Sequence, residues 1–197
     1  MKVIFLDIDG VLNSNQRAKE IHDRFDQGLA TQEELNNWDL PYEGTLVPLK
    51  HIIDQTGARI VLSSYWRYDP ERIKALNKVF SPYGFQIMDQ TPIARITLKT
   101  LFNIGVSKKQ IHDYHSMYAG ENCDPYTTDR GAEIAIYLHR HPEIESFVIL
   151  DDDIFDIKTY FPGKTVRPNF YKGGLNMDLA KQAINILLNK KSEEAVL

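Results

Sequence analysis

Short apolar runs alternate along the chain with segments in which apolar residues recur at every third or fourth position. The apolar runs predict five strands, at Lys2–Asp7, Arg59–Ser63, Phe85–Asp89, Ser146–Asp151 and Thr165–Arg167. The first and the fourth are apolar at consecutive positions, which is typical of strands that are buried on both faces of a parallel sheet.

Helical periodicity fills the intervals between these strands. Apolar residues at helical spacing cover 46–53 and stop at Gly57, and further helices are expected after Pro70, over 132–138 and after Asn176. Because strands alternate with helices, the sequence predicts an α/β fold, namely a doubly wound, three-layer α/β/α sandwich around a parallel sheet.

Two of the predicted strands end in acidic residues. The first runs into Asp7, Asp9 and then Gly10, which lets the chain turn, and the fourth runs into Asp151–Asp153, with Asp156 shortly after. Open α/β sheets bind ligands beyond the carboxyl ends of their strands. Carboxylates this close together repel one another unless a cation or a proton relieves them, so the pattern predicts one shared metal site.

The expected metal is Mg²⁺. It is bound by oxygen ligands, keeps several waters and is held by few protein carboxylates together with substrate phosphate. An EF-hand calcium loop is excluded, because a strand rather than a helix precedes Asp7 and the twelfth residue of such a loop would be Ala18 instead of a glutamate.

Two polar segments interrupt the alternation of strands and helices. We expect residues 14–40 to form a flap or short helices over the site, and residues 91–129 to form a small insert; neither segment is long enough for a large cap. The remainder predicts a single domain over residues 1–189, with a flexible charged tail at 190–197.

Composition narrows the function classes. The protein has a net charge of −4 and a pI near 5.9, so it is acidic overall and has no excess of positive charge to attract nucleic acid or an anionic membrane. The first apolar run is too short for a signal peptide or a membrane span, and the single Cys123 excludes an internal disulfide. We therefore expect a cytoplasmic, reducing compartment, with export into another cell's cytosol left open.

Three motifs and one basic residue occur in a characteristic order along the chain. They are L-D-I-D-G-V-L-N, V-L-S-S-Y-W-R, a basic residue about 22 positions before Asp152, and V-I-L-D-D-D. In this order they resemble the haloacid dehalogenase (HAD) superfamily of aspartate-based phosphotransferases, and in particular the HAD domains of RNA-repair proteins and polynucleotide phosphatases. The resemblance implies a five-stranded Rossmann-like sheet of order 5-4-1-2-3 without a large cap.

The resemblance also implies the catalytic roles. Asp7 would be the nucleophile that becomes an aspartyl-phosphate, and Asp9 would protonate the leaving oxygen and then activate the hydrolytic water. Ser63 would hydrogen-bond the transferring phosphoryl group, and Arg130 would neutralise its charge. These roles are consistent with two-step displacement by a carboxylate and with a cationic clamp on the phosphoryl oxygens.

The implied metal ligands come from the two acidic strand ends. The carboxylates of Asp7 and Asp152 and the backbone carbonyl of Asp9 would hold Mg²⁺, and Asp151 and Asp156 would support the metal shell. These assignments make the two strand ends a single site.

The phosphate clamp leaves alternatives open. Ser64 competes with Ser63, because neighbouring residues of a strand point to opposite faces, and Ser63 is favoured. The family more often has lysine at the position given to Arg130, so Lys108 and Lys109 remain rivals.

Further polar residues have less specific interpretations. Arg67 is either a second phosphate contact or a surface arginine. His112 and His115 flank Asp113, but no further ligands accompany them, so we interpret all three as polar loop residues.

The function implied is a magnesium-dependent phosphatase whose open site suits a phosphorylated macromolecule. The acidic pI favours a phosphoprotein, and an aromatic cluster that either lines the cleft mouth or packs beneath the flap suits a phosphotyrosine ring: Tyr65, Trp66 and Tyr68. The resemblance favours a nucleic-acid end. A small phosphometabolite remains possible, and the presence of both Asp7 and Asp9 disfavours a non-catalytic binding domain.

Overall fold

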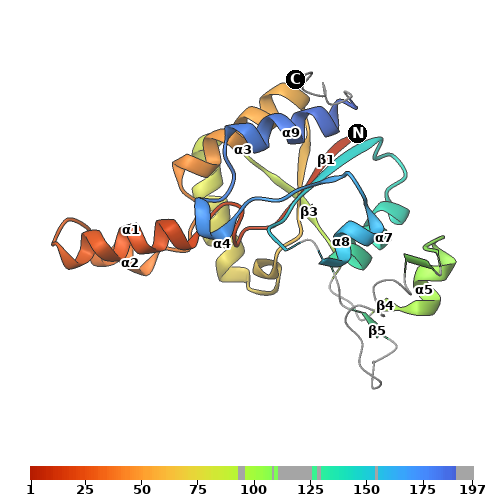
Figure 1. Ribbon diagram of the computed structural model, residues 1–197, viewed down its shortest axis with the longest axis horizontal. Helices are drawn as coiled ribbons and strands as arrows, with labels where there is room; N and C mark the ends of the chain where they lie inside the picture. The colour runs from red at the N-terminus through yellow and green to blue at the C-terminus, as the bar shows by residue number, and fades with distance from the viewer. Residues whose placement is uncertain (93–95, 108, 111–125, 128–129, 154, 190–197) are drawn as a thin grey trace, which may run out of the picture.

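The computed structural model describes residues 1–92, 96–107, 109–110, 126–127, 130–153 and 155–189. A parallel five-stranded sheet of order β3-β2-β1-β6-β7 lies at its centre (Figure 1). Its strands are β1 (Lys2–Leu6), β2 (Arg59–Leu62), β3 (Ile87–Gln90), β6 (Ser146–Leu150) and β7 (Thr165–Val166). Counted as the five predicted strands, the order is 3-2-1-4-5, so the predicted fold class and strand order are confirmed.

Helices cover both faces of the sheet (Figure 1). On one face pack α3 (Glu43–Thr56), α4 (Pro70–Phe80) and α9 (Met177–Leu187), and on the other pack α7 (Arg130–Arg140) and α8 (Phe155–Tyr160). These two helical layers and the sheet make the three layers that the sequence predicts.

Alternation along β1 divides the core in two. Ile4 and Leu6 pack in the cluster that contains α3 and α9, whereas Val3 and Phe5 pack in the cluster that contains α7 and α8. The ring of Phe5 meets that of Tyr137 on α7 edge-on, with centroids 5.6 Å apart. By the same alternation, the next odd-numbered residue, Asp7, belongs to the α7 side of the sheet.

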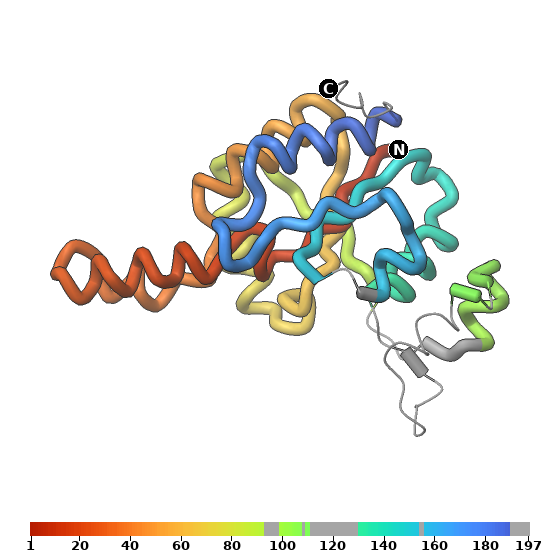
Figure 2. Tube along the Cα trace, viewed as in Figure 1, coloured from red at the N-terminus to blue at the C-terminus, as the bar shows by residue number. Residues whose placement is uncertain are grey.

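The two polar segments form small elements outside the sheet. In the first, α1 (Asn15–Asp26) and α2 (Gln32–Asn36) pack on each other as an arm that projects from the body (Figure 2). In the second, β4 (Ile96–Thr97) and β5 (Tyr126–Thr127) form an antiparallel pair, and α5 (Leu98–Asn103) follows β4.

In the described part of the chain, short 3-10 helices occur in the loops: η1 (Tyr65–Tyr68), η2 (Ser81–Tyr83) and η3 (Phe170–Lys172). Of these, η1 matters most for the site, because it follows β2 directly at the carboxyl edge of the sheet. Among the described residues, no helix has the length and apolar character needed to cross a membrane.

Arg67 is neither a surface arginine nor an exposed phosphate contact. Its guanidinium pairs with the Glu133 carboxylate of α7 at 2.5 Å, and the two side chains are 1% and 2% exposed. The same guanidinium donates to the carbonyl of Ser64 at 2.7 Å. This buried ion pair therefore joins η1, at the end of β2, to the first turn of α7.

Replacement of Glu133 by leucine should lower the free energy of unfolding by about 3–5 kcal/mol, because it leaves the Arg67 charge buried without its partner. The double variant Arg67→Met/Glu133→Leu should recover at least half of that loss. Urea denaturation measures both. The matched control is Glu71→Leu, which removes an exposed ion pair with Lys74 and should lower the free energy of unfolding by less than about 1 kcal/mol. A loss below about 1 kcal/mol for Glu133→Leu would contradict this account.

Candidate active site

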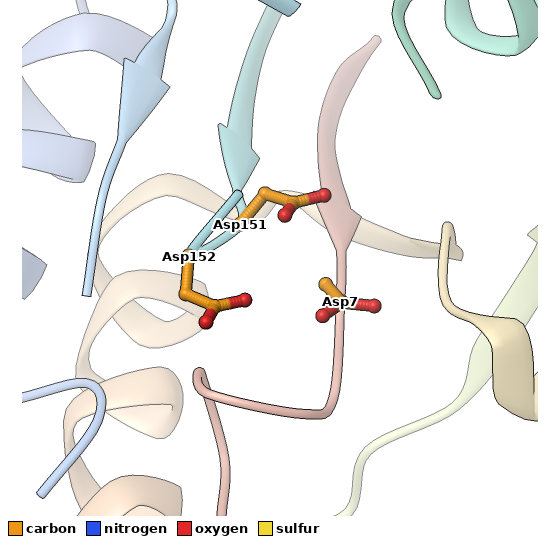
Figure 3. A group of neighbouring side chains, drawn as sticks. All are labelled: Asp7, Asp151 and Asp152. Atoms are coloured by element: carbon orange, nitrogen blue, oxygen red, sulfur yellow. The ribbon is translucent and has the colours of Figure 1, made fainter. Parts of the chain in front are cut away.

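Three carboxylates converge at the carboxyl edge of the sheet. Asp7 follows β1, and Asp151 and Asp152 follow β6; one oxygen from each lies within 4.8 Å of the others (Figure 3). Asp7 and Asp151 are buried, and Asp152 is partly exposed. The two acidic strand ends that the sequence places in one site are thus brought together.

Strand pairing continues up to these acids and fixes their backbone. The N–H of Asp7 donates to the carbonyl of Leu150 at 2.9 Å. The turn after β1 passes close to Asp152, because Gly10 has a φ of +74° and a Cβ at this position would overlap the Asp152 carboxyl group. Glycine at position 10 therefore permits both the turn and the approach of Asp152.

Arg130, the first residue of α7, brings a positive charge to this cluster. Its guanidinium lies 3.2 Å from an oxygen of Asp7 and 3.7 Å from an oxygen of Asp151. The helix end itself is held by Asp156, whose carboxylate accepts a hydrogen bond from the N–H of Gly131. Asp156 is not one of the three clustered carboxylates, and this hydrogen bond connects it to the start of the helix that carries Arg130.

The electrostatics reflect crowding of buried acids around one arginine. Burial raises the pKa of Asp7 to about 6, against the lowering effects of Arg130 and the nearby Ser64 hydroxyl. The pKa of Asp151 is raised well above its ordinary value by burial and by Asp7. Burial also acts to lower the pKa of Arg130, but its carboxylate neighbours raise it, so the guanidinium stays charged.

Both candidate serines lie at this site. The N–H of Ser63 donates to the carbonyl of Leu6 at 2.8 Å, and its hydroxyl is buried with no hydrogen-bond partner among the described residues. The Ser64 hydroxyl accepts a hydrogen bond from the N–H of Trp66 at 3.4 Å, and it also acts to lower the pKa of Asp7. An unpartnered buried hydroxyl at Ser63 is suited to an incoming oxygen ligand.

Asp9 is exposed and is not one of the three clustered carboxylates, but its charge helps to raise the pKa of Asp7 and of Asp152. One of its carboxylate oxygens accepts from the side-chain amide of Asn13 at 2.8 Å, and the other accepts from the indole N–H of Trp66 at 3.1 Å. Its side chain is therefore fixed by protein donors, and the predicted ligation of Mg²⁺ by its backbone carbonyl stays a prediction.

The aromatic cluster divides between core and surface. Trp66 is buried, whereas Tyr65 and Tyr68 are 70% and 48% exposed and stack with ring centroids 5.8 Å apart. The Arg130 guanidinium lies 5.4 Å from the centre of the Tyr65 ring. Tyr65 therefore presents an exposed aromatic face beside the catalytic arginine candidate.

The remaining candidates have no described contact with the site. Lys109 is exposed. Lys108 and the loop group His112, Asp113 and His115 lie outside the described residues.

Sequence reasoning missed Arg167, which follows β7 at the same edge of the sheet. Its Nε donates to the backbone carbonyl of Asp152 at 2.7 Å, and its side chain is exposed. The signal was available, because the predicted fifth strand ends at this residue and so places it beside the acidic ends. No comparable signal in the sequence indicated that Asn13 and Trp66 contact the Asp9 carboxylate.

A family model described as the HAD domain in Swiss Army Knife RNA repair proteins matches residues 3–178. The chain belongs to this family of HAD domains. The resemblance that the motifs indicated is therefore confirmed, and with it an enzyme of the general HAD hydrolase and phosphatase type. Comparison with curated proteins and with solved structures gives no match.

HAD domains generally use Mg²⁺, and the residues of this chain fit such an ion. The three clustered donors are all carboxylates, as a hard divalent cation requires. The raised pKa values of Asp7, Asp151 and Asp152 report a cluster that is unfavourable when fully ionised without an added positive charge.

We expect Asp7→Asn to stabilise the metal-free protein at pH 7.5. Because the pKa of Asp7 rises from 3.8 to about 6 on folding, the wild type loses stability as pH rises through this interval, and asparagine removes that loss. In EDTA the variant should melt at least about 3 °C higher at pH 7.5, with a smaller difference at pH 4. Thermal melts measure this.

The matched control is Asp54→Asn, an exposed acid on α3 paired with Lys50, which should leave the melting temperature within about 1 °C of the wild type. Mg²⁺ should raise the melting temperature of the wild type more than that of Asp7→Asn. A lower melting temperature for Asp7→Asn in EDTA at pH 7.5 would contradict the electrostatic account.

Proposed function

We propose that this HAD domain is a magnesium-dependent phosphomonoesterase that works through an aspartyl-phosphate on Asp7. The observation that carries the proposal is the convergence of Asp7, Asp151 and Asp152 at one strand edge, with Arg130 in contact with two of them. Asp7 and Asp152, with the carbonyl of Asp9, would hold Mg²⁺. When bound, the ion would neutralise charge on the phosphoryl oxygens.

The residues divide the reaction into two displacements. A carboxylate oxygen of Asp7 attacks phosphorus while the bond to the leaving oxygen breaks, and Asp9 gives that oxygen its proton. Water then attacks the aspartyl-phosphate and loses a proton to Asp9, which releases inorganic phosphate and restores Asp7. Arg130 stabilises the charge on the phosphoryl oxygens, and the unpartnered Ser63 hydroxyl donates to one of them.

Asp7→Asn should lower kcat for an aryl phosphate at least a thousandfold, since an amide cannot replace the nucleophile. Asp152→Ala should raise the Mg²⁺ concentration needed for half-maximal activity at least tenfold. Phosphate release at increasing Mg²⁺, with EDTA as the zero point, measures both effects.

Asp54→Asn again serves as the control and should leave both quantities unchanged. Residual activity of Asp7→Asn within tenfold of the wild type would exclude Asp7 as the nucleophile. Full activity in EDTA would exclude the metal.

The substrate that we propose first is the phosphorylated end of an RNA. The family takes its description from RNA repair proteins, and Arg167 supports a substrate with more than one phosphate. Among the described residues no carboxylate forms an ion pair with Arg167, while the bond from its Nε to the backbone carbonyl of Asp152 holds the guanidinium at the metal edge of the sheet. The exposed Tyr65 ring suits stacking with a base.

A phosphotyrosine protein is the second candidate, as the sequence favoured. The net charge of −4 is poor for attracting nucleic acid, and the exposed Tyr65 ring beside Arg130 suits a phosphotyrosine ring as well as a base. The two candidates differ in the number of phosphates that they bring to the protein.

We expect Arg167→Gln to lower kcat/KM for phosphorylated oligoribonucleotides about tenfold and to leave that for an aryl phosphate within twofold. The variant should also reduce the salt dependence of log kcat/KM by about 0.7, the contribution of one released counterion. The matched control is Arg140→Gln, an exposed arginine at the far end of α7.

An equal effect of Arg167→Gln on both substrates would assign Arg167 to the metal site instead of the RNA. A higher and salt-insensitive kcat/KM for a phosphotyrosine peptide, lost in Tyr65→Ala, would replace RNA with phosphoprotein as the substrate.

A further inference from the structure

Asp9 is an exposed carboxylate held by two buried donors. The indole N–H of Trp66 donates to one of its oxygens at 3.1 Å, and the side-chain amide of Asn13 donates to the other at 2.8 Å. Trp66 is 2% exposed and Asn13 is 1% exposed, so neither donor is free to follow a moving carboxylate. These two buried donors therefore fix the position of the Asp9 side chain.

Asn13 is itself fixed through both ends of its amide. Its oxygen accepts from the N–H of Gly10 at 3.0 Å, and its nitrogen also donates to the backbone carbonyl of Asp39 at 2.7 Å. The first bond closes the turn that follows Asp9, and the second ties this turn to the chain that returns from the α1–α2 arm.

Trp66 is fixed by contacts on its ring. The guanidinium of Arg72 on α4 lies 4.7 Å from the ring centre and pairs with the carboxylate of Asp39 at 2.9 Å. Asp39 is therefore linked to both supports of Asp9, directly to Asn13 through its carbonyl and indirectly to Trp66 through Arg72. These residues form a closed chain of contacts around the Asp9 carboxylate.

We propose that Trp66 and Asn13 are positioning residues that hold Asp9 in the orientation for proton transfer. The inference rests on the proposed function and adds to it two residues outside the reacting groups. A flexible aspartate would lose effective concentration at the leaving oxygen, whereas an aspartate held by two donors keeps it. A carboxylate has about four acceptor positions, so two hydrogen bonds leave room for the transferred proton.

The proton balance determines what the loss of this support affects. Asp9 gives a proton to the leaving oxygen as the bond from phosphorus to that oxygen breaks, and regains one from the water that attacks the aspartyl-phosphate. An alkyl oxygen is too basic to leave without this proton, whereas a nitrophenolate leaves readily without it. Hydrolysis of the aspartyl-phosphate is the same for every substrate, so the leaving group matters only in the first displacement, which kcat/KM reports. A misplaced Asp9 therefore lowers kcat/KM far more for alkyl phosphates than for nitrophenyl phosphate.

The test is Trp66→Phe, which keeps an aromatic ring in the buried position and removes the N–H donor. With Mg²⁺ present, kcat/KM for an alkyl phosphate should fall at least tenfold, kcat/KM for 4-nitrophenyl phosphate should stay within threefold, and the Mg²⁺ requirement should not change. Trp38→Phe is the matched control, because this tryptophan has no contact with Asp9 among those described, and it should leave both substrates unchanged.

An equal loss of kcat/KM for both substrates would make Trp66 a packing residue and overturn the inference while leaving the phosphatase in place. Unchanged kcat/KM for both substrates would overturn it as well. If the wild type hydrolyses neither ester, the proposed function fails and the inference fails with it.

A second measurement does not require a change at Trp66. In the nuclear magnetic resonance spectrum, Asp9→Asn should move the indole N–H signal of Trp66 and leave that of Trp38 in place. An unmoved Trp66 signal would overturn the contact on which the inference rests.

Discussion

The pairing of β1 with β6 imposes the constraint on which the site depends. Leu6 lies opposite Leu150 in this parallel pair, so the residues that follow, Asp7 and Asp151, leave the sheet side by side on its α7 face. Both are buried, and one arginine, Arg130, is shared between them. The burial of two carboxylates against one guanidinium leaves an excess of negative charge, which a divalent cation can balance.

Much of the surrounding structure keeps this charge balance in place. Asp156 accepts from the first turn of α7, and the buried pair of Arg67 and Glu133 fixes the same turn to η1. Together they determine where Arg130 stands relative to β1. Movement of Arg130 away from this position is unfavourable, because these polar contacts lie in the interior. A cation that is already in place stabilises developing charge without having to move.

The sequence predicts the sheet and its acidic edge because both follow from local patterns. Apolar runs gave all five strands to within about two residues at each end, although the third begins at Ile87 instead of Phe85. Contacts between distant residues were not predictable in this way. The burial of Arg67 against Glu133 and the contact of Trp66 with Asp9 depend on how η1 meets α7 and β1, which no periodicity encodes.

The most direct test of the account is detection of the covalent intermediate. The protein is mixed with a phosphorylated substrate and Mg²⁺, quenched in acid within milliseconds, digested and analysed by mass spectrometry. One added phosphoryl group is expected on the peptide that contains Asp7, lost on treatment with hydroxylamine and absent without Mg²⁺. A phosphoryl group on any other residue, or turnover without a phosphorylated peptide at any quench time, would contradict the central role of Asp7.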